Sequence, residues 1–396
     1  MPKRILILGG GFAGLAAARE LGRRSRSDIS VRLVDRRARS VFLPLLPDAI
    51  SHRIRPRYMG PSLAELCRRF GVDFTQRCVR HIAPDSGLVE TDRGTLRADI
   101  LLICLGCETR YFGNQQARKR AIGLRSLEEA RRIRTALLRL ARDSHDASGS
   151  RPHMLMVGGG YTGFETAGQA AYLLHTELGW PPESIPERLP IVILEKAPDV
   201  LRTCSPTVRR WAREAVLHLG VEVRTRCTVE EFTDSGAVLT DGTEVPRALV
   251  TWSPGATPGE AAAALETPRV KGGRLAVDEF LRLPERETAF AAGDAAGPAP
   301  RGDVLRMAIQ FSLAAGTVAA RNALRTLAGK PLRRFDPPDL GYVVPLLPGR
   351  ASGVVLGKKM WGRAPSLLHY VMCSLRSWRW KDRLGVLNDF ISRRAG

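Results

Sequence analysis

Three glycines at a fixed spacing follow an apolar strand near the N-terminus. The strand Ile5–Leu8 leads into Gly9, Gly11 and Gly14, and an Ala- and Leu-rich helix is expected over residues 15–24. The first glycine of such a turn allows a tight bend, the second lets the backbone approach a pyrophosphate, and the third lets helix and strand pack closely. The pyrophosphate then faces the unpaired N–H groups at the helix N-terminus. The spacing therefore predicts a dinucleotide-binding site.

The next strand ends in an acid, Asp35, which stands 21 residues beyond Gly14. This is the distance expected for a carboxylate that binds the hydroxyls of a ribose. Strand, glycine turn, helix, strand and acid together form a βαβ unit with parallel strands.

The same design occurs a second time. Gly158, Gly160 and Gly163 follow the strand 154–157, and Glu195 ends the next strand, 32 residues beyond the last glycine. The longer spacing holds four prolines, which predict an inserted loop: Pro181, Pro182, Pro186 and Pro190. An acid at this position hydrogen-bonds a free 2′-hydroxyl and repels a 2′-phosphate, which favours NADH over NADPH.

Two dinucleotide units in one chain favour two different ligands. The economical interpretation places FAD in one unit and a nicotinamide nucleotide in the other, with hydride passing from the nicotinamide to the flavin.

These units predict an α/β fold with two Rossmann-like dinucleotide-binding domains and a C-terminal helical segment. A discontinuous FAD-binding domain is expected over residues 1–110 and 260–330, and a connector and NAD(P)H-binding domain over residues 111–259. A helix is expected from Ser126 through Arg142 in the connector, and a hairpin turn at Asp241-Gly242. Residues 331–396 form the expected membrane-associating or interface segment.

The chain resembles the two-dinucleotide-binding flavoproteins, the pyridine nucleotide oxidoreductases, from about Lys3 to Arg394. Within that family it is most similar to the type II NADH dehydrogenases, which are single-chain NADH:quinone oxidoreductases. The resemblance implies FAD and NADH as cofactors and a quinone as electron acceptor. It assigns these residues to FAD: Gly9, Gly11, Phe12, Ala13, Gly14, Asp35, Arg36, Pro44, Gly106, Gly293, Asp294 and Gln310. It assigns these residues to NADH: Gly158, Gly160, Tyr161, Gly163, Glu165, Glu195 and Gly255.

Two residues gain a catalytic role from the resemblance. Glu165 occupies a Gly-x-Glu position that in the family lies close to the nicotinamide and flavin rings, where it would position groups or handle a proton. Gln310 matches the first glutamine of the family's quinone motif. Ala314 and Ala315 stand where a later glutamine is usual, which leaves the acceptor open.

The cysteines leave alternatives open. Disulfide reductases of this superfamily carry a cysteine pair in the loop after the first acid, but residues 36–49 contain none. Cys104 and Cys107 form the one close pair and are read either as buried core thiols or as a redox dithiol. A sulfide:quinone or carrier-protein reductase remains an alternative function. A redox-switched nucleotide-binding protein is an alternative of another class.

The charge of the chain is unusual, with 61 Lys and Arg against 40 Asp and Glu, a net +21. Twelve basic and four acidic residues lie in residues 331–396, where the apolar runs 367–375 and 384–391 flank arginines and tryptophans. Two amphipathic helices of this kind favour an anionic membrane surface, although packing on the chain's own core or in a homodimer would use the same faces. A GC-rich genome, which favours Arg, would also produce a basic surface without a partner.

The remaining sequence features limit where the protein is expected to be located and which partners it is expected to have. No helix-turn-helix, zinc-finger or RNA-binding signature indicates a nucleic-acid partner. No run reaches the length of a transmembrane helix, no signal peptide is visible, and no residues have metal-ligand spacing. A peripheral protein on the cytoplasmic face of a membrane, or otherwise a cytoplasmic one, is expected.

Overall fold

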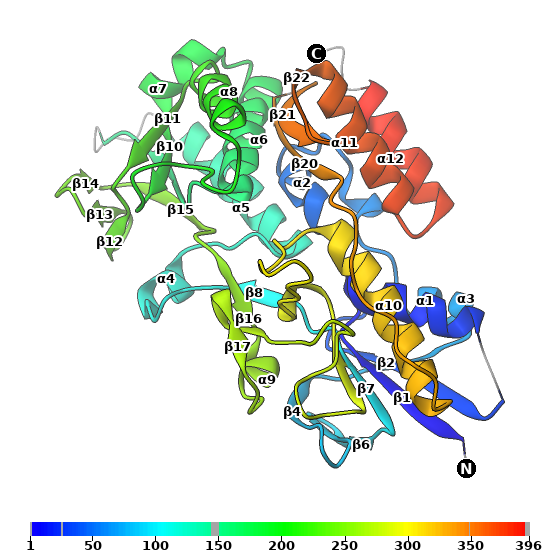
Figure 1. The fold of residues 1–396 in the computed structure, drawn as a ribbon. Coiled ribbons are helices and arrows are strands. Elements are labelled where there is room, and N and C mark those ends of the chain that lie inside the picture. The colour runs from blue at the N-terminus through cyan, green and yellow to red at the C-terminus, as the bar shows by residue number, and fades with distance from the viewer. Residues whose placement is uncertain (1, 25–26, 144–149, 348, 393–396) are drawn as a thin grey trace. The chain divides into compact units, whose positions relative to one another are not determined.

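The first glycine turn joins β1 (Lys3–Leu8) to α1 (Phe12–Arg23), and β2 (Ile29–Asp35) follows. These elements come from a computed structural model of the chain, which describes residues 2–24, 27–143, 150–347 and 349–392 (Figure 1). β1 pairs in parallel with β2 and with β7 (Ile100–Ile103). The expected βαβ unit is therefore present, and its helix begins within the glycine turn itself.

The chain folds into two compact units, each built from several stretches of sequence. Unit 1 comprises Met1–Ser40, Pro61–Glu108 and Ala256–Pro338, and unit 2 comprises Val41–Gly60, Thr109–Gly255 and Asp339–Gly396.

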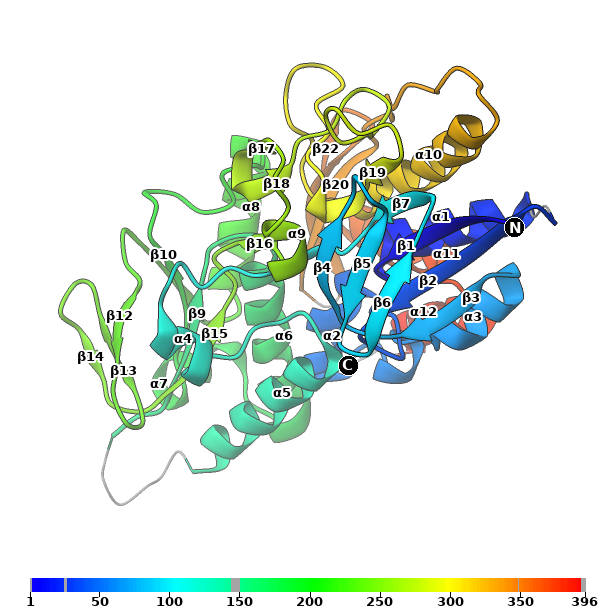
Figure 2. The same cartoon turned by 90° about the horizontal axis from the view of Figure 1, so that it is seen from below.

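Unit 1 is built on a five-stranded sheet in the order β19-β7-β1-β2-β3, with β3 at Asp73–Gln76 and β19 at Ala289–Ala291. Helix α1 and helix α10 (Ile309–Leu327) pack together on one face. A small antiparallel sheet, β4 to β6, covers the other face (Figure 2). Strands β7 and β19 and the second half of β1 are apolar on both faces because both faces are buried there.

The remaining elements of unit 1 are short, apart from α3. They are α3 (Leu63–Phe70), β4 (Val79–Ala83), β5 (Leu88–Thr91), β6 (Gly94–Arg97), β8 (Cys107–Thr109, which ends at the unit boundary), β16 (Ala256–Pro258), α9 (Glu260–Ala263), β17 (Arg269–Val270), β18 (Arg274–Leu275), and the 3-10 turns η4 (Lys271–Gly273) and η5 (Gly293–Ala295).

Unit 2 repeats the parallel design in a four-stranded sheet of order β11-β10-β9-β15. Its strands and larger helices are β9 (His153–Val157), α6 (Tyr161–Leu178), β10 (Ile191–Glu195), α8 (Pro206–Leu217), β11 (Val221–Thr225) and β15 (Ala248–Trp252). The proline-rich insertion forms two short helical turns, η3 (Pro182–Ser184) and α7 (Ile185–Arg188).

Two local predictions in unit 2 are confirmed. Helix α5 (Leu127–Arg142) is capped by Ser126, whose hydroxyl accepts a hydrogen bond from the backbone N–H of Glu129 at 3.1 Å. The hairpin turns at Asp241-Gly242, where Gly242 has φ +82°. The surrounding elements are α4 (Gln115–Arg120), β12 (Val229–Phe232), β13 (Ala237–Leu239) and β14 (Glu244–Val245).

The structure divides the chain differently from the sequence in two places. Residues 41–60, expected in the FAD-binding domain, pack within unit 2 because the buried helix α2 (Leu46–Ser51) lies against α5 and α6. Residues 331–396 are expected as a separate segment, but residues 331–338 fold with unit 1 and residues 339–396 fold with unit 2.

The C-terminal part forms a three-stranded antiparallel sheet followed by two helices. Its elements are β20 (Gly341–Leu347), β21 (Arg350–Val355), β22 (Lys358–Gly362), α11 (Arg363–Arg376) and α12 (Trp380–Ser392), and the 3-10 turns of the 41–60 stretch are η1 (Leu43–Leu45) and η2 (Pro56–Tyr58). The expected helices 367–375 and 384–391 are thus confirmed and are longer than predicted. Arg393 and Arg394 lie outside the described residues. Among the helices described, none combines the length and the apolar character needed to cross a membrane.

Candidate functional site

The first glycine turn is closed on its inner side and open on its outer side. A Cβ at Gly9 would lie 2.3 Å from the carbonyl oxygen of Cys104, and one at Gly14 would lie 1.8 Å from that of Gly9. Gly11 has no heavy atom within 4 Å of a Cβ position. The turn therefore packs against the sheet through two glycines and leaves backbone exposed at the third, as a pyrophosphate cradle requires.

Asp35 ties the end of β2 to this turn. Its Oδ2 accepts a hydrogen bond from the N–H of Gly10 at 2.6 Å, and its Oδ1 accepts one from the N–H of Arg37 at 2.8 Å. The carboxylate is thereby fixed beside the turn, and its remaining lone pairs can accept from ribose hydroxyls. The side chain of Arg36 pairs with Glu108 at 2.8 Å on the surface.

The second glycine turn has the same construction. A Cβ at Gly158 would lie 2.6 Å from the carbonyl oxygen of Ser253, one at Gly163 would lie 2.1 Å from that of Gly158, and Gly160 is open. Glu195 accepts hydrogen bonds from the N–H groups of Gly159 and Ala197, both at 2.8 Å. Both turns thus have an acid held by the backbone at the expected place.

Two further residues assigned to NADH lie beside the second turn in the fold. Tyr161, the first residue of α6, receives a hydrogen bond from the Sγ of Cys204 at 3.4 Å, and burial raises the pKa of its hydroxyl. Gly255 follows β15, and its carbonyl accepts from the N–H of Arg110 at 3.0 Å. The neighbouring Trp252 donates from Nε1 to the Arg110 carbonyl at 3.0 Å, which anchors this turn.

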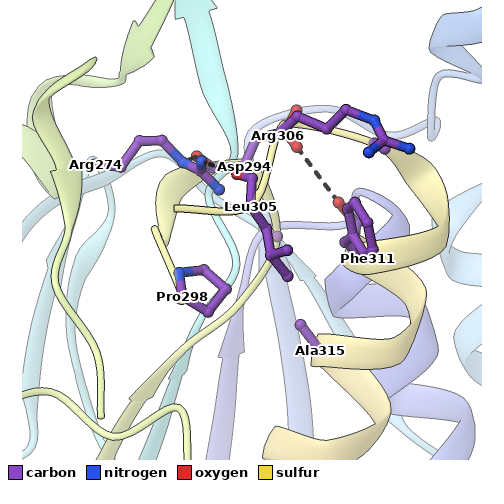
Figure 3. Close-up of a pocket in the computed structure, with 10 residues that line it drawn as sticks. Arg274, Asp294, Pro298, Leu305, Arg306, Phe311 and Ala315 are labelled. Carbon is purple, nitrogen blue, oxygen red and sulfur yellow. Dashed lines mark hydrogen bonds between the residues drawn. The ribbon is translucent and has the colours of Figure 1, made fainter. Parts of the chain in front are cut away.

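A small pocket lies at the N-terminus of α10 in unit 1 (Figure 3). Gly293 and Asp294 line it together with Phe311 and Ser312. The hydroxyl of Ser312 donates to the Asp294 carboxylate at 3.4 Å, and no side chain caps the first turn of α10. The positive end of the α10 dipole faces this pocket, which makes it a suitable place for an electron-rich ring edge.

Sequence reasoning missed Arg274, which braces this pocket. The side chain is buried, and its Nε donates to the carbonyl of Asp294 at 3.0 Å. Other guanidinium nitrogens donate to the carbonyls of Leu305, at 2.6 Å, and Ala296. An arginine at the start of a two-residue strand carries no sequence signal for this role, because its three acceptors are backbone atoms from distant positions.

Gln310, Ala13 and Gly106 lie in the same unit as this pocket. Gln310 is half-buried in the first turn of α10, as expected. A Cβ at Gly293 would meet the Cβ of Ala13 at 2.9 Å, so the two flavin-assigned turns touch. Gly106 has φ +67° and open space around it.

The close cysteine pair behaves as buried core thiols. The Sγ of Cys107 donates to the carbonyl of Asp294 at 3.2 Å. Burial raises the pKa of Cys104 to about 12, so that its thiol stays protonated at neutral pH and is a poor nucleophile.

Glu165 is half-buried in unit 2. Desolvation, and then the charge of Asp48, raise the pKa of its carboxyl well above the ordinary value. Desolvation also raises the pKa of Asp48 to about 6. Pro44, which was also assigned to FAD, lies in η1 of unit 2. It precedes Asp48 of α2 by one helical turn.

Two of the expected site residues, Glu165 and Pro44, therefore fold with unit 2, whereas Gln310 and Asp294 fold with unit 1. Groups of three or more His, Cys, Asp or Glu able to hold a metal are absent from the part of the chain that the structure describes.

Comparison with known proteins agrees with this geometry. Residues 3–323 match the pyridine nucleotide-disulphide oxidoreductase family, and the chain belongs to that family. Membership confirms the expected oxidoreductase class, the mixed α/β dinucleotide-binding fold, and FAD and NADH as cofactors.

Two curated relatives and one solved structure show more specifically which proteins the chain is similar to. The chain is 30% identical over 407 residues to demethylphylloquinone reductase NdbB of Synechocystis sp., covering 99% of this chain and 96% of the relative. It is 28% identical over 361 residues to the type II NADH:quinone oxidoreductase Ndh of Mycobacterium tuberculosis, covering 86% and 77%. Its fold matches NDH2 from Plasmodium falciparum in complex with NADH, with a TM-score of 0.86 at 16% identity over 100% of this chain and 99% of the other.

Proposed function

We propose that this protein is a FAD-dependent NADH:quinone oxidoreductase that works at a membrane surface. The proposal rests on one observation above all: a single chain carries two glycine turns of the same construction, each with an acid held by the backbone of the turn. The quinone acceptor is supported by the names of the relatives, which align over nearly the whole chain.

NADH is assigned to the turn of unit 2. The open backbone at Gly160 takes the pyrophosphate, and Tyr161 and Gly163 continue the helix behind it. Glu195 binds the adenosine ribose and repels a 2′-phosphate, so that NADH is preferred over NADPH. Gly255 ends the turn that follows β15 on the same sheet.

FAD is assigned to unit 1. Gly9, Gly11 and Gly14 hold the pyrophosphate, and Asp35 holds the ribose. The carboxylate of Asp294, oriented by Ser312, binds the ribityl chain. When bound, FAD accepts hydride from NADH and passes electrons onward. The protein stabilises the negative charge of the reduced ring through the N-terminus of α10.

Glu165 and Gln310 are assigned to the reacting groups. A carboxyl with a raised pKa holds a proton more readily and can then donate a hydrogen bond, and the pKa of Glu165 is raised. The amide of Gln310, in the first turn of α10, orients the acceptor.

Stopped-flow absorbance of the flavin tests the proposal. NADH and NADPH are compared as reductants, and quinone and dioxygen are compared as oxidants of the reduced protein. We expect faster reduction by NADH and faster reoxidation by quinone. Reduction by NADH followed by reoxidation with dioxygen or a carrier protein, but with no quinone analogue, would refute the assignment of the acceptor.

The membrane surface is assigned to the outer sides of α11 and α12. Leu367 and Leu375 are exposed on α11, and Trp380, Leu384 and Ile391 form one exposed stripe on α12 at helical spacing. Exposed apolar stripes with basic neighbours such as the exposed Lys381 suit the headgroup region of an anionic bilayer. The protein would then sit peripherally on the cytoplasmic face.

One arginine of this segment has another role than the basic pattern indicates. Arg379 is buried, and its guanidinium makes two hydrogen bonds to Asp382 at 2.7 and 2.8 Å. It fixes the start of α12 and is not available to lipid.

A further inference from the structure

Arg53 is a buried arginine of unit 2, and one edge of its guanidinium makes no hydrogen bond to a described residue. The side chain is 1% exposed, and it follows α2 in the stretch 41–60. Its Nε and Nη2 have no hydrogen-bond partner among the residues that the structure describes. A buried charged donor left unpaired is strongly destabilising, so such a group is unusual unless it serves a ligand.

The N–H groups of the two unpartnered nitrogens point in the same direction. Nε and Nη2 lie on the same edge of the planar guanidinium, and their N–H groups therefore run parallel. This is the edge through which arginines bind an electron-rich oxygen with two hydrogen bonds. Arg53 thus presents a preformed pair of donors.

The nearest acid is already occupied. Asp48 Oδ1 accepts from the hydroxyl of Tyr370 at 2.6 Å and from Nε2 of Gln169 at 3.2 Å. The charge of Arg53 lowers the pKa of Asp48, against the larger effect of desolvation, so the two charges interact without a hydrogen bond between them. Because Tyr370 and Gln169 hold Asp48 in place, the donors of Arg53 remain available.

Two aromatic rings hold the guanidinium. Its central carbon lies 5.1 Å from the ring centre of Tyr370 and 5.6 Å from that of Phe390, and these rings stack on each other at 4.3 Å. Two aromatic rings therefore border the guanidinium, and such rings favour a planar aromatic ligand over a hydrated phosphate.

The rings belong to the helices whose outer sides carry the exposed apolar stripes. Tyr370 comes from the inner side of α11 and Phe390 from the inner side of α12. Arg53 therefore lies behind the helix pair whose outer sides are assigned to the lipid surface.

We infer that Arg53 binds a carbonyl oxygen of the quinone through its Nε and Nη2 N–H groups, as a determinant of acceptor affinity. This inference rests on the proposed function. The overall reaction, NADH + H⁺ + quinone → NAD⁺ + hydroquinone, places two electrons and two protons on the quinone. The guanidinium of Arg53 stabilises the negative charge that develops on the oxygen before protonation.

The test compares R53Q and R53K in the full-length, FAD-loaded protein with R57Q as matched control. Arg57 is exposed in the same stretch, so R57Q removes the same charge without touching the buried group. Steady-state rates are measured with NADH and a short-chain ubiquinone analogue, and separately with ferricyanide, which needs no hydrogen-bonded oxygen. Quinone binding is measured independently by quenching of tryptophan fluorescence.

We expect R53Q to raise the quinone KM about tenfold or more, because a hydrogen bond from a charged donor is lost. The ferricyanide rate should stay within about twofold of wild type, R53K should keep part of the quinone affinity, and R57Q should match wild type.

A wild-type quinone KM in R53Q overturns the inference. Loss of FAD and of the ferricyanide rate in both Arg53 variants, with quinone KM unchanged, also overturns it and assigns the side chain to folding. If the wild-type protein reduces ferricyanide but no quinone, the proposed function fails. The fluorescence titration then decides on Arg53 alone, because quinone binding that survives R53Q contradicts the inference and binding that is lost supports it.

Discussion

Replacing Asp48 by Asn should flatten the dependence of stability on pH. Desolvation raises the pKa of the folded Asp48 carboxyl to about 6, from an ordinary value of 3.8. A carboxyl with a raised pKa binds a proton more tightly in the folded state, so the wild-type protein loses stability as pH rises from the unfolded to the folded pKa. D48N carries no charge at this position and should lack this loss.

The size of the effect follows from the two pKa values. Each unit of pKa difference corresponds to about 1.4 kcal/mol, so the fully ionised carboxylate costs about 3 kcal/mol. The cost rises from about 1.6 kcal/mol at about pH 5 to about 3 kcal/mol at about pH 7.5, a difference of about 1.4 kcal/mol. For a unit of 150–250 residues this corresponds to a shift of about 3–6 °C in Tm.

The assay is the thermal unfolding of holoenzyme followed by circular dichroism, at about pH 5 and about pH 7.5. The Tm difference between wild type and D48N should move by about 3–6 °C in favour of D48N at the higher pH. D234N is the control, since Asp234 is fully exposed and its substitution should leave the pH dependence unchanged. Parallel curves for wild type and D48N, or a relative gain by wild type at higher pH, would show that Asp48 is not desolvated as described.

Three further outcomes follow from the site. Gly14→Ala should impair folding of the holoprotein, because the new Cβ would meet the Gly9 carbonyl at 1.8 Å. Gly11→Ala should fold, because its Cβ meets no heavy atom within 4 Å, but it should lose most of its bound FAD, as measured by flavin content per chain. Glu195→Gln should reduce the preference for NADH over NADPH about tenfold, mainly through a lower KM for NADPH; an unchanged ratio of kcat/KM values would contradict the assigned role. Trp380→Glu should weaken co-sedimentation with anionic vesicles about tenfold at an unchanged ferricyanide rate, and equal binding would remove α12 from the membrane face.

The parts that could be predicted from the sequence are local in the chain. The glycine turns, the acids that follow them and the cap at Ser126 each depend on residues a few tens of positions apart within one βαβ unit or one helix. Backbone geometry alone demands glycine at Gly9 and Gly158, where φ is +106° and +112°. Such requirements leave a readable mark in the residue type.

The parts that could not be predicted depend on distant pairings. Arg274 binds three carbonyls, and any residue can provide a carbonyl, so no pattern reveals it. The stretch 41–60 looks like a loop of the first domain, yet Arg55 forms an ion pair with Asp389, 334 positions away. Only the folded chain shows that this stretch, and Arg53 within it, belongs with the C-terminal helices.

The buried cysteines have a practical consequence. All seven are free, and six are buried, whereas Cys78 is half-exposed. Burial raises the pKa of Cys67 and Cys104 in unit 1 to about 12 and also raises that of Cys373 in unit 2, so these thiols react with an alkylating reagent only when their surroundings open. The native cysteines can therefore serve as probes of local unfolding, in the same way as backbone amides do in hydrogen exchange. Mass spectrometry of alkylated peptides would report the opening free energy of each unit separately, with and without bound nucleotide, and without any engineered probe.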